Sequence, residues 1–382
     1  IIHGLNFRMC QKFAPKGIVM SEAVALRLQS VAWQEIEQVF MVTSAVDVDQ
    51  VVEISNATNI YESVAGIVGV VDGFKKTDES VVVSDLSNLE NTGSIDVHTP
   101  KCTAASVSDN YRNTVIAYVA GVAGRFKAGN KTCTVSNITN RGNVTITGWY
   151  GQGLPGDSED VNYADIDSCL AGAIGHIEAT TVSHIYNYGK VSFPEGYSRF
   201  HYVGGVVGIS GGGAQLSNLH NYGVVELPNA KVDGVTVQAT FASLHCAGVL
   251  AHSVAGSSLT NSTNNKNVSV KCATVGGGSR RHFRVAGVVA FAYGSVDNCT
   301  NDKNGQIACD VHINKSGDWK DVCVGGVVGL KFSNAISNST NNAHLYVKIN
   351  SLNGGTTAAK RISVGGVVCR HTLATLLLTT EQ

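Results

Sequence analysis

The chain has 382 residues, of which 15% are charged, and its 28 Lys and Arg residues nearly balance its 29 Asp and Glu residues, leaving a formal net charge of −1. So small a charge, without an acidic or basic tail, disfavours nucleic acid as a partner. No run of about 18 apolar residues occurs, so no membrane span is predicted.

Residues 1–59 lack the pattern that dominates the rest of the chain, and we expect them to form an N-terminal cap or lead-in. Residues 21–40 are helix-like. A stacked array of repeats needs an atypical end to cover its open rung. Residues 54–59 resemble residues 336–341, either as a degenerate repeat or by chance. Because the chain begins with Ile1, the sequence leaves open a removed signal peptide or a missing N-terminal region.

Residues 60–382 repeat one three-part unit about eight times. In residues 322–349 the unit is a glycine-aliphatic strand, then an aliphatic residue five positions before an asparagine, then a short alternating strand. The last four intervals between units are close to 40 residues, and such a period is typical of a solenoid, a propeller or an array. The second glycine of the unit recurs at Gly66, Gly121, Gly172, Gly205, Gly248, Gly287, Gly326 and Gly366.

The glycine strand is apolar on both faces, which is typical of a sheet covered on both sides. Two residues before the glycine, we predict one inward column that includes Val203, Val285, Val324 and Val364. The glycine itself is expected where another layer of backbone comes close.

The residue after the glycine is also apolar, and we expect it to point away from the core as a possible interaction stripe. A stripe of that length exceeds the apolar surface that a soluble monomer usually exposes. Either other segments of the chain cover it, or a second molecule lies along it in self-association or a filament. The stripe consists of Ile67, Val206, Val249, Val288, Val327 and Val367.

The second part of the unit predicts a turn with two columns of polar residues. Asparagine tolerates left-handed backbone and stacked amides bond one another, so we interpret both columns as structural corners rather than a polar binding site. In the third part, for example residues 225–227, apolar and other residues alternate, as they do in a strand with one face toward solvent. The first column contains Asn88, Asn137, His184, Asn218, Asn261, Asn298 and Asn338, and the second contains Asn91, Asn140, Asn187, Asn221, Asn264, Asn301 and Asn341.

Three strand signals in each repeat predict an all-β fold, a parallel β-solenoid of about eight repeats of roughly 40 residues with a short C-terminal end. A seven- or eight-bladed β-propeller is the alternative, because the period also suits a blade of four strands.

The GGVVG-like strand, followed by an N-x-x-N-x-G turn and an aliphatic strand, resembles the GLUG-type repeats of bacterial and protist surface proteins. The resemblance covers about residues 60–369 and implies a right-handed parallel β-helix-like solenoid of the kind associated with adhesins. It carries no catalytic residues. The repeats are longer than the usual GLUG unit, and Lys266, Lys303 and Ala343 replace its turn glycine.

The ten cysteines are an even number, yet Cys246, Cys272 and Cys309 occupy inward strand positions that are aliphatic in other repeats. We interpret the cysteines as mostly reduced core thiols. Cys272 and Cys309 are expected to lie diagonally, roughly 7–8 Å apart, so we predict no disulfide between them. The sequons at Asn137, Asn261, Asn298 and Asn338 coincide with the corner motif and are weak evidence for glycosylation.

Residues with catalytic chemistry are few. A pair of carboxylates could act as acid and base on a glycosidic bond, although a solvated loop also explains an acidic cluster. Five histidines occur without metal-ligand spacing or a serine elbow, and the glycines at 211–213 and 276–278 lack the residues of a phosphate loop, so we predict no metal, nucleophile or cofactor. The acidic residues are Asp157, Glu159, Asp160, Asp165 and Asp167, and the histidines are His184, His201, His220, His245 and His252.

Two functions follow as hypotheses. The first is a non-enzymatic extracellular or cell-surface repeat protein that acts in adhesion or as a structural component of a surface assembly, binding other proteins or surface glycans through its loops or its apolar stripe. The second is a carbohydrate-active β-helix enzyme, a polysaccharide lyase or hydrolase, which an acidic pair converging in one groove would favour.

Overall fold

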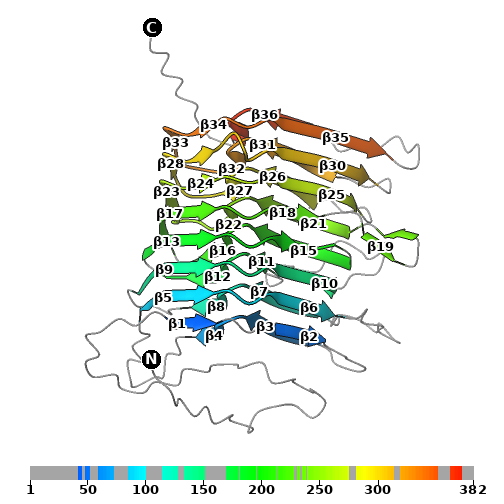
Figure 1. Cartoon of the computed structure of the whole chain (residues 1–382). Coiled ribbons are helices and arrows are strands. Elements are labelled where there is room, and N and C mark those ends of the chain that lie inside the picture. Colours follow the sequence, from blue (N-terminus) through cyan, green and yellow to red (C-terminus); the bar gives the residue numbers. More distant parts are fainter. Residues whose placement is uncertain are drawn as a thin grey trace, which may run out of the picture.

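The computed structural model describes residues 42–44, 48–51, 59–72, 85–99, 114–127, 133–150, 169–179, 181–194, 196–211, 213–227, 230–232, 235–237, 239–274, 281–313, 319–351 and 362–371. Within these ranges the protein is all β, and its strands stack rung upon rung, with β1 (Val42–Ser44) and β2 (Val48–Val51) at one end of the stack and β36 (Ile362–Gly365) and β37 (Val368–His371) at the other (Figure 1). The expected helical segment at residues 21–40 lies outside the described residues.

Three long parallel sheets, called A, B and C here, contain 11, 16 and 8 of the described strands. Sheet A contains β1 (Val42–Ser44), β5 (Leu86–Asn91), β9 (Thr134–Asn140), β13 (Thr181–Asn187), β17 (Gln215–Asn221), β23 (Ser258–Thr260), β24 (Thr263–Asn264), β28 (Val296–Asp297), β29 (Thr300–Asn301), β33 (Ile336–Ser337) and β34 (Thr340–Asn341). Sheet C contains β4 (Val68–Asp72), β8 (Ala123–Lys127), β12 (Ile174–Glu178), β16 (Val207–Gly211), β22 (Leu250–Ser253), β27 (Val289–Ala292), β32 (Val328–Lys331) and β37 (Val368–His371).

Sheet B receives two kinds of strand from each repeat. Those before the repeated glycine are β3 (Asn59–Ala65), β7 (Thr114–Ala120), β11 (Cys169–Ala171), β15 (Gly196–Gly204), β21 (Ala239–Ala247), β26 (Arg281–Ala286), β31 (Trp319–Gly325) and β36 (Ile362–Gly365). Those after the asparagine turn are β2 (Val48–Val51), β6 (Ile95–Thr99), β10 (Val144–Tyr150), β14 (Val191–Ser192), β18 (Val225–Leu227), β25 (Val268–Thr274), β30 (Ile307–Ile313) and β35 (Leu345–Ser351).

Strand pairing decides between the two predicted architectures. Successive rungs pair in parallel and in register, as in the series Val203, Cys246, Val285 and Val324. Among the described strands, only β19 (Ala230–Val232) and β20 (Val235–Val237) pair antiparallel. A propeller blade is an antiparallel sheet, so the propeller alternative is wrong and the parallel β-solenoid is confirmed.

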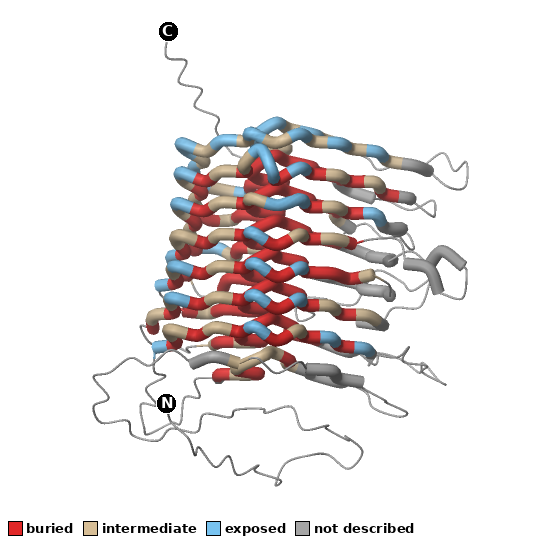
Figure 2. Tube along the Cα trace, viewed as in Figure 1, coloured by how far each residue is buried: buried red, intermediate tan, exposed pale blue. Residues whose placement is uncertain are grey.

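Two hydrophobic cores run along the stack, and Figure 2 shows buried residues in successive rungs. One gathers inward side chains from both kinds of sheet B strand, and the other gathers those of sheets A and C. Val203, Val285 and Val324 lie fully buried in the first core, as predicted. Val364 continues their register but is 52% exposed, because it lies on the last described rung.

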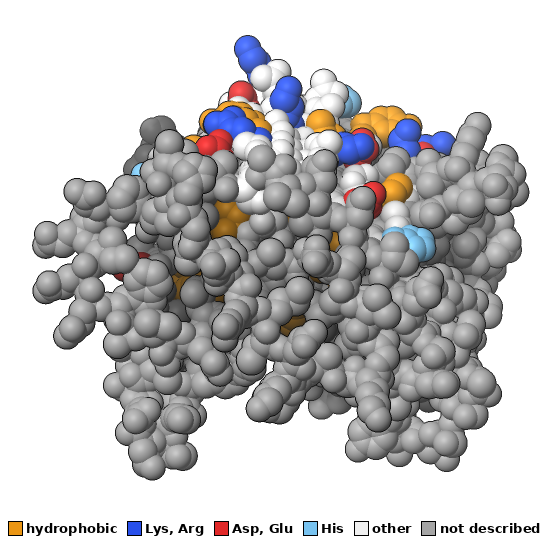
Figure 3. All heavy atoms as spheres, turned by 60° about the horizontal axis from the view of Figure 1, so that its bottom comes forward, with side chains coloured by type: hydrophobic (Ala, Val, Ile, Leu, Met, Phe, Trp, Pro, Cys, Tyr) orange, Lys and Arg blue, Asp and Glu red, His pale blue; other side chains and the backbone are white. Residues whose placement is uncertain are grey.

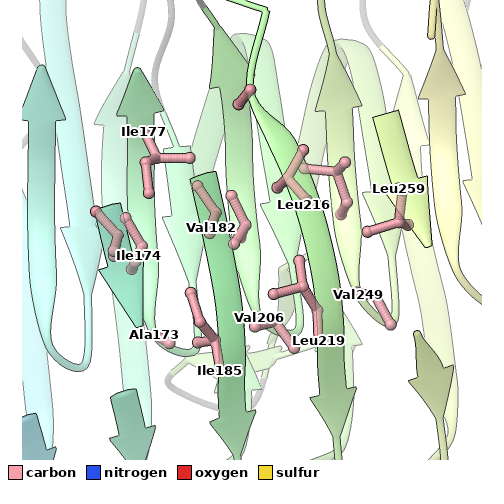
Figure 4. Close-up of a cluster of buried hydrophobic side chains, with 14 of the residues drawn as sticks. Ala173, Ile174, Ile177, Val182, Ile185, Val206, Leu216, Leu219, Val249 and Leu259 are labelled. Carbon is pink, nitrogen blue, oxygen red and sulfur yellow. The ribbon is translucent and has the colours of Figure 1, made fainter. Parts of the chain in front are cut away.

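The interaction stripe is not a surface. Val206, Val249, Val288 and Val327 are fully buried in the second core, where Ile67 also packs, and only Val367 on the last described rung is exposed. Figure 4 shows Val206 and Val249 among the side chains of sheets A and C. The expectation failed because the chain bends at the repeated glycine and the following residue, so the strand alternation restarts there and both Val206 and Val207 point inward.

The second polar column forms a buried amide ladder between the two cores. Each Nδ2 donates to the Oδ1 of the next rung, at 2.8–3.0 Å from Asn91 through to Asn341. The Nδ2 of Asn221 also donates to the carbonyl of Gly223 at 2.7 Å, which closes the turn. The first polar column adopts positive φ, for example 54° at Asn137 and 49° at Asn298. Both columns are therefore structural corners, as predicted.

The repeated glycine faces this ladder. A Cβ on Gly121 would lie 2.2 Å from Cγ of Asn140, and one on Gly248 would lie 2.3 Å from Cγ of Asn264. The two recurring features of the repeat, the glycine and the asparagine, thus occupy one crowded point, where the two layers of a rung touch.

The strand ladder begins before residue 60. β1 pairs in register with β5, which places Ser44 opposite Asn91, and β2 pairs with β6. These residues form a half rung beneath the first complete repeat. The described part of the chain has no helix with the length and hydropathy that a membrane crossing requires.

Candidate functional site

Only some of the candidate residues named from the sequence lie in the described part of the structure. The acidic residues Asp157, Glu159, Asp160, Asp165 and Asp167 and the glycines at 276–278 lie outside the described residues. His245 and His252 come together where the outer faces of sheets B and C meet, whereas His184 and His220 lie on the outer face of sheet A. His201 belongs to β15, and its side chain is outside the described part of the structure.

The first cluster consists of His245, His252, Arg284, Phe291 and Tyr202. The Nδ1 atoms of His245 and His252 are 3.1 Å apart and their rings stack. Arg284 lies 4.2 Å from the centroid of the Phe291 ring, and its Nη1 donates to Nε2 of His245 at 2.8 Å. Because a guanidinium only donates, His245 keeps its proton on Nδ1 and donates it to His252.

Burial, with Arg284 nearby, holds both imidazoles neutral. It lowers the pKa of His252 to about 3 and that of His245 well below its ordinary value. Two neutral rings and a guanidinium form a structural cluster that is a weak proton acceptor at neutral pH.

A second group of polar side chains lies in other rungs, where the outer faces of sheets B and C meet. His176 Nε2 is 3.4 Å from Oε1 of Glu178, whose other oxygen lies 3.4 Å from Nζ of Lys127. The hydrogen bond from His176 lowers the pKa of Glu178 most, with help from Lys127. Within the described residues, no three His, Cys, Asp or Glu side chains are arranged to hold a metal ion.

The third cluster is an exposed column on the asparagine side of the solenoid. Tyr188 and Tyr222 stack with 4.9 Å between ring centroids, and Arg141 covers Tyr188 at 4.8 Å. Tyr186 and His220 stack beside them at 5.4 Å. We call these five residues the tyrosine column. Tyr188 is 43% exposed and Tyr222 is 36% exposed, so both side chains are partly open to solvent.

The backbone makes the tyrosine column rigid. Tyr188 and Tyr222 each follow an asparagine of the buried amide ladder, and their own amides donate to the preceding rung at 2.8 and 2.7 Å. Burial raises the pKa of Tyr222, and Tyr188 and Tyr186 add to this, so its hydroxyl stays protonated at neutral pH.

Sequence reasoning missed the tyrosine column, although a signal was present. Asn-Tyr-Gly occurs at residues 187–189 and again at 221–223, so tyrosines at equal positions beside the ladder must stack in neighbouring rungs. In the face that Figure 3 shows, basic, acidic and apolar side chains lie intermixed along the upper rim.

Comparisons with known proteins do not assign the chain to a family. The chain matches no family model, and comparison with curated proteins and with solved structures also gave no match. The resemblance to GLUG-type repeats therefore stays a prediction.

Proposed function

We propose that the chain is a non-enzymatic extracellular or cell-surface repeat protein, acting in adhesion or as a structural component of a surface assembly, and that the tyrosine column is its contact surface. The observation that carries the proposal is the exposed, stacked pair Tyr188 and Tyr222 beside Arg141. Tyr and Arg are enriched among the residues that dominate binding energy at protein interfaces.

Rigidity supports this assignment. A tyrosine held in a stack loses little conformational freedom on binding, so its contact area contributes more of its energy to affinity. The amide ladder fixes the backbone beside both rings. A partner that presents a flat apolar patch with acceptors for hydroxyl groups and Arg141, as protein surfaces and surface glycans do, complements the column.

The polar side chains where the outer faces of sheets B and C meet also support a structural role for the chain. Burial keeps His245 and His252 neutral, and Glu178 is engaged by His176 and Lys127. These groups stabilise one another in positions that the stack sets.

Binding and turnover can be tested side by side. The purified chain is applied to arrays of surface glycans and extracellular proteins, and it is also incubated with neutral and acidic polysaccharides while released sugar ends are measured. The proposal expects saturable binding without release. Steady release of sugar ends would instead favour the polysaccharide lyase or hydrolase, and the carboxylates at residues 157–167 would then be the first to substitute.

A further inference from the structure

The last described rung is more exposed than the rung below it. It consists of β36 and β37, and it has a neighbouring rung on one side within the described residues. Ile362 is 50% exposed and Val364 is 52% exposed, whereas Val324 one rung below is fully buried. In a stacked array each rung is stabilised by its neighbours, so an end rung opens first.

Where the outer faces of sheets B and C meet, two positions of neighbouring rungs lie next to each other. The outward residue of a sheet B strand lies against the second residue of the sheet C strand one rung later. A Cβ on Gly124 would lie 2.3 Å from Oγ of Ser63, and a Cβ on Gly208 would lie 2.8 Å from Cβ of Cys169. Two side chains at these positions must therefore touch.

Cys323 and Cys369 occupy these two neighbouring positions in the last two described rungs. Cys323 continues the column of Cys169, through Tyr202, His245 and Arg284. Cys369 follows Val368, which continues the column of Val207, so Cys369 takes the place that Gly208 has in its own rung.

The side chains of the two cysteines are in contact. The Cys369 side chain is hydrogen-bonded to that of Cys323, which with burial raises the pKa of the Cys369 thiol above its ordinary value. Sγ of Cys369 also donates to the carbonyl of Ser363 at 3.0 Å. Cys323 is buried, whereas Cys369 is partly exposed and can be reached by a reagent. Disulfides form between cysteines whose Cβ atoms are about 3.5–4.5 Å apart, a separation that touching side chains allow.

We propose that Cys323 and Cys369 are a disulfide site that locks the last described rung to the one below it when the protein meets an oxidising environment. The oxidant is a small-molecule disulfide such as oxidised glutathione. The Cys369 thiolate attacks it and releases one glutathione thiolate, and the Cys323 thiolate then attacks Sγ of Cys369 and releases the second. Two protein thiols lose two protons and two electrons, and the small disulfide is reduced to two thiols.

This site does not depend on the proposed function, although an extracellular location would maintain the bond. The raised pKa of Cys369 makes the exchange slow at neutral pH and faster as pH rises, which suits a structural bond rather than a catalytic one.

The test uses the full chain with oxidised glutathione, followed by alkylation and peptide mapping without reduction. We expect a linked peptide pair containing Cys323 and Cys369, with the mass of two hydrogens lost. Amide exchange in residues 362–365 should slow by about tenfold or more on oxidation and recover on reduction. Cys133→Ser should leave the link intact, whereas Cys323→Ser should abolish both effects.

The proposal is overturned if folded, oxidised wild-type protein yields Cys323 and Cys369 only as alkylated thiols or glutathione adducts. Linkage of either cysteine to a different cysteine would overturn it equally. Because these readouts use the wild-type chain, they do not depend on the folding of a variant.

Discussion

Gly287 faces the side-chain amide of Asn301 so closely that a Cβ on the glycine would stand 2.3 Å from Cγ of Asn301 and 2.3 Å from the carbonyl oxygen of Gly326. From Gly66 to Gly326, the glycine and the asparagine of each rung are therefore two halves of one contact. This contact brings the two layers of a rung together and separates the two hydrophobic cores.

Gly287→Ala should destabilise the protein by about 2–3 kcal/mol, because the methyl group must displace both a bonded amide and backbone. Gly366 holds the same place on the last described rung, and a Cβ there would meet no described atom within 4 Å. Gly366→Ala is thus the matched control and should stay within about 0.5 kcal/mol of wild type. Equal urea midpoints for the two variants would contradict the contact.

Asn221→Ala should cost about 2–4 kcal/mol, because it leaves the Nδ2 of Asn187, the Oδ1 of Asn264 and the carbonyl of Gly223 without their buried partner. Asn218 has φ 54°, which glycine adopts readily, so Asn218→Gly should change stability by only a few tenths of a kcal/mol. Denaturant unfolding of both variants separates a role in the ladder from a role in the corner. A mild effect of Asn221→Ala would show that the ladder adds little stability.

Acid should destabilise the protein through His245 and His252. A histidine whose pKa is lowered in the folded state is neutral there, so between the folded and unfolded values the unfolded chain binds more protons. The pKa of His252 is lowered to about 3 from an ordinary value of 6.5, so this stability is complete above about pH 6.5 and falls as pH drops toward 3. Arg284, His176 and His282 face the pair and oppose its protonation.

The measurement is the urea midpoint of wild type and His252→Asn at several values between pH 7 and pH 4. The variant removes one of the two titrating rings, so its midpoint should fall less steeply over this range. Parallel curves would show that other groups cause the acid sensitivity.

The repeat pattern correctly predicted which residues lie above one another in neighbouring rungs. Val203, Val285 and Val324 share one place relative to the glycine, and they form one buried column. The paired register of Val270 with Cys309 and of Cys272 with Val311 confirms the diagonal placement of the two cysteines. Cys246 and Cys309 are buried thiols, as expected.

The direction in which side chains near a bend of the rung point could not be predicted from the repeat pattern. Alternation through Gly205 and Val206 places Val206 outside, but the bend between sheets B and C turns it inward. The stacking of Tyr188 on Tyr222 was missed although Asn-Tyr-Gly recurs at both places, because the asparagine column was interpreted as a corner and the residue after each asparagine was not aligned between repeats. The half rung of β1 and β2 was missed because Ser44 stands where later repeats have asparagine.

The contact surface is tested most directly by the dissociation constant of the Tyr188→Ala/Tyr222→Ala double variant for the glycan or protein found by array binding. Tyr346 is 53% exposed on β35 and stands apart from the tyrosine column, so Tyr346→Ala is the matched control. Removal of two anchoring tyrosines should weaken binding at least about tenfold, while the control binds as wild type does and all three unfold at similar urea concentrations. Equal affinity of the double variant and wild type would contradict the proposal that the tyrosine column is the contact surface.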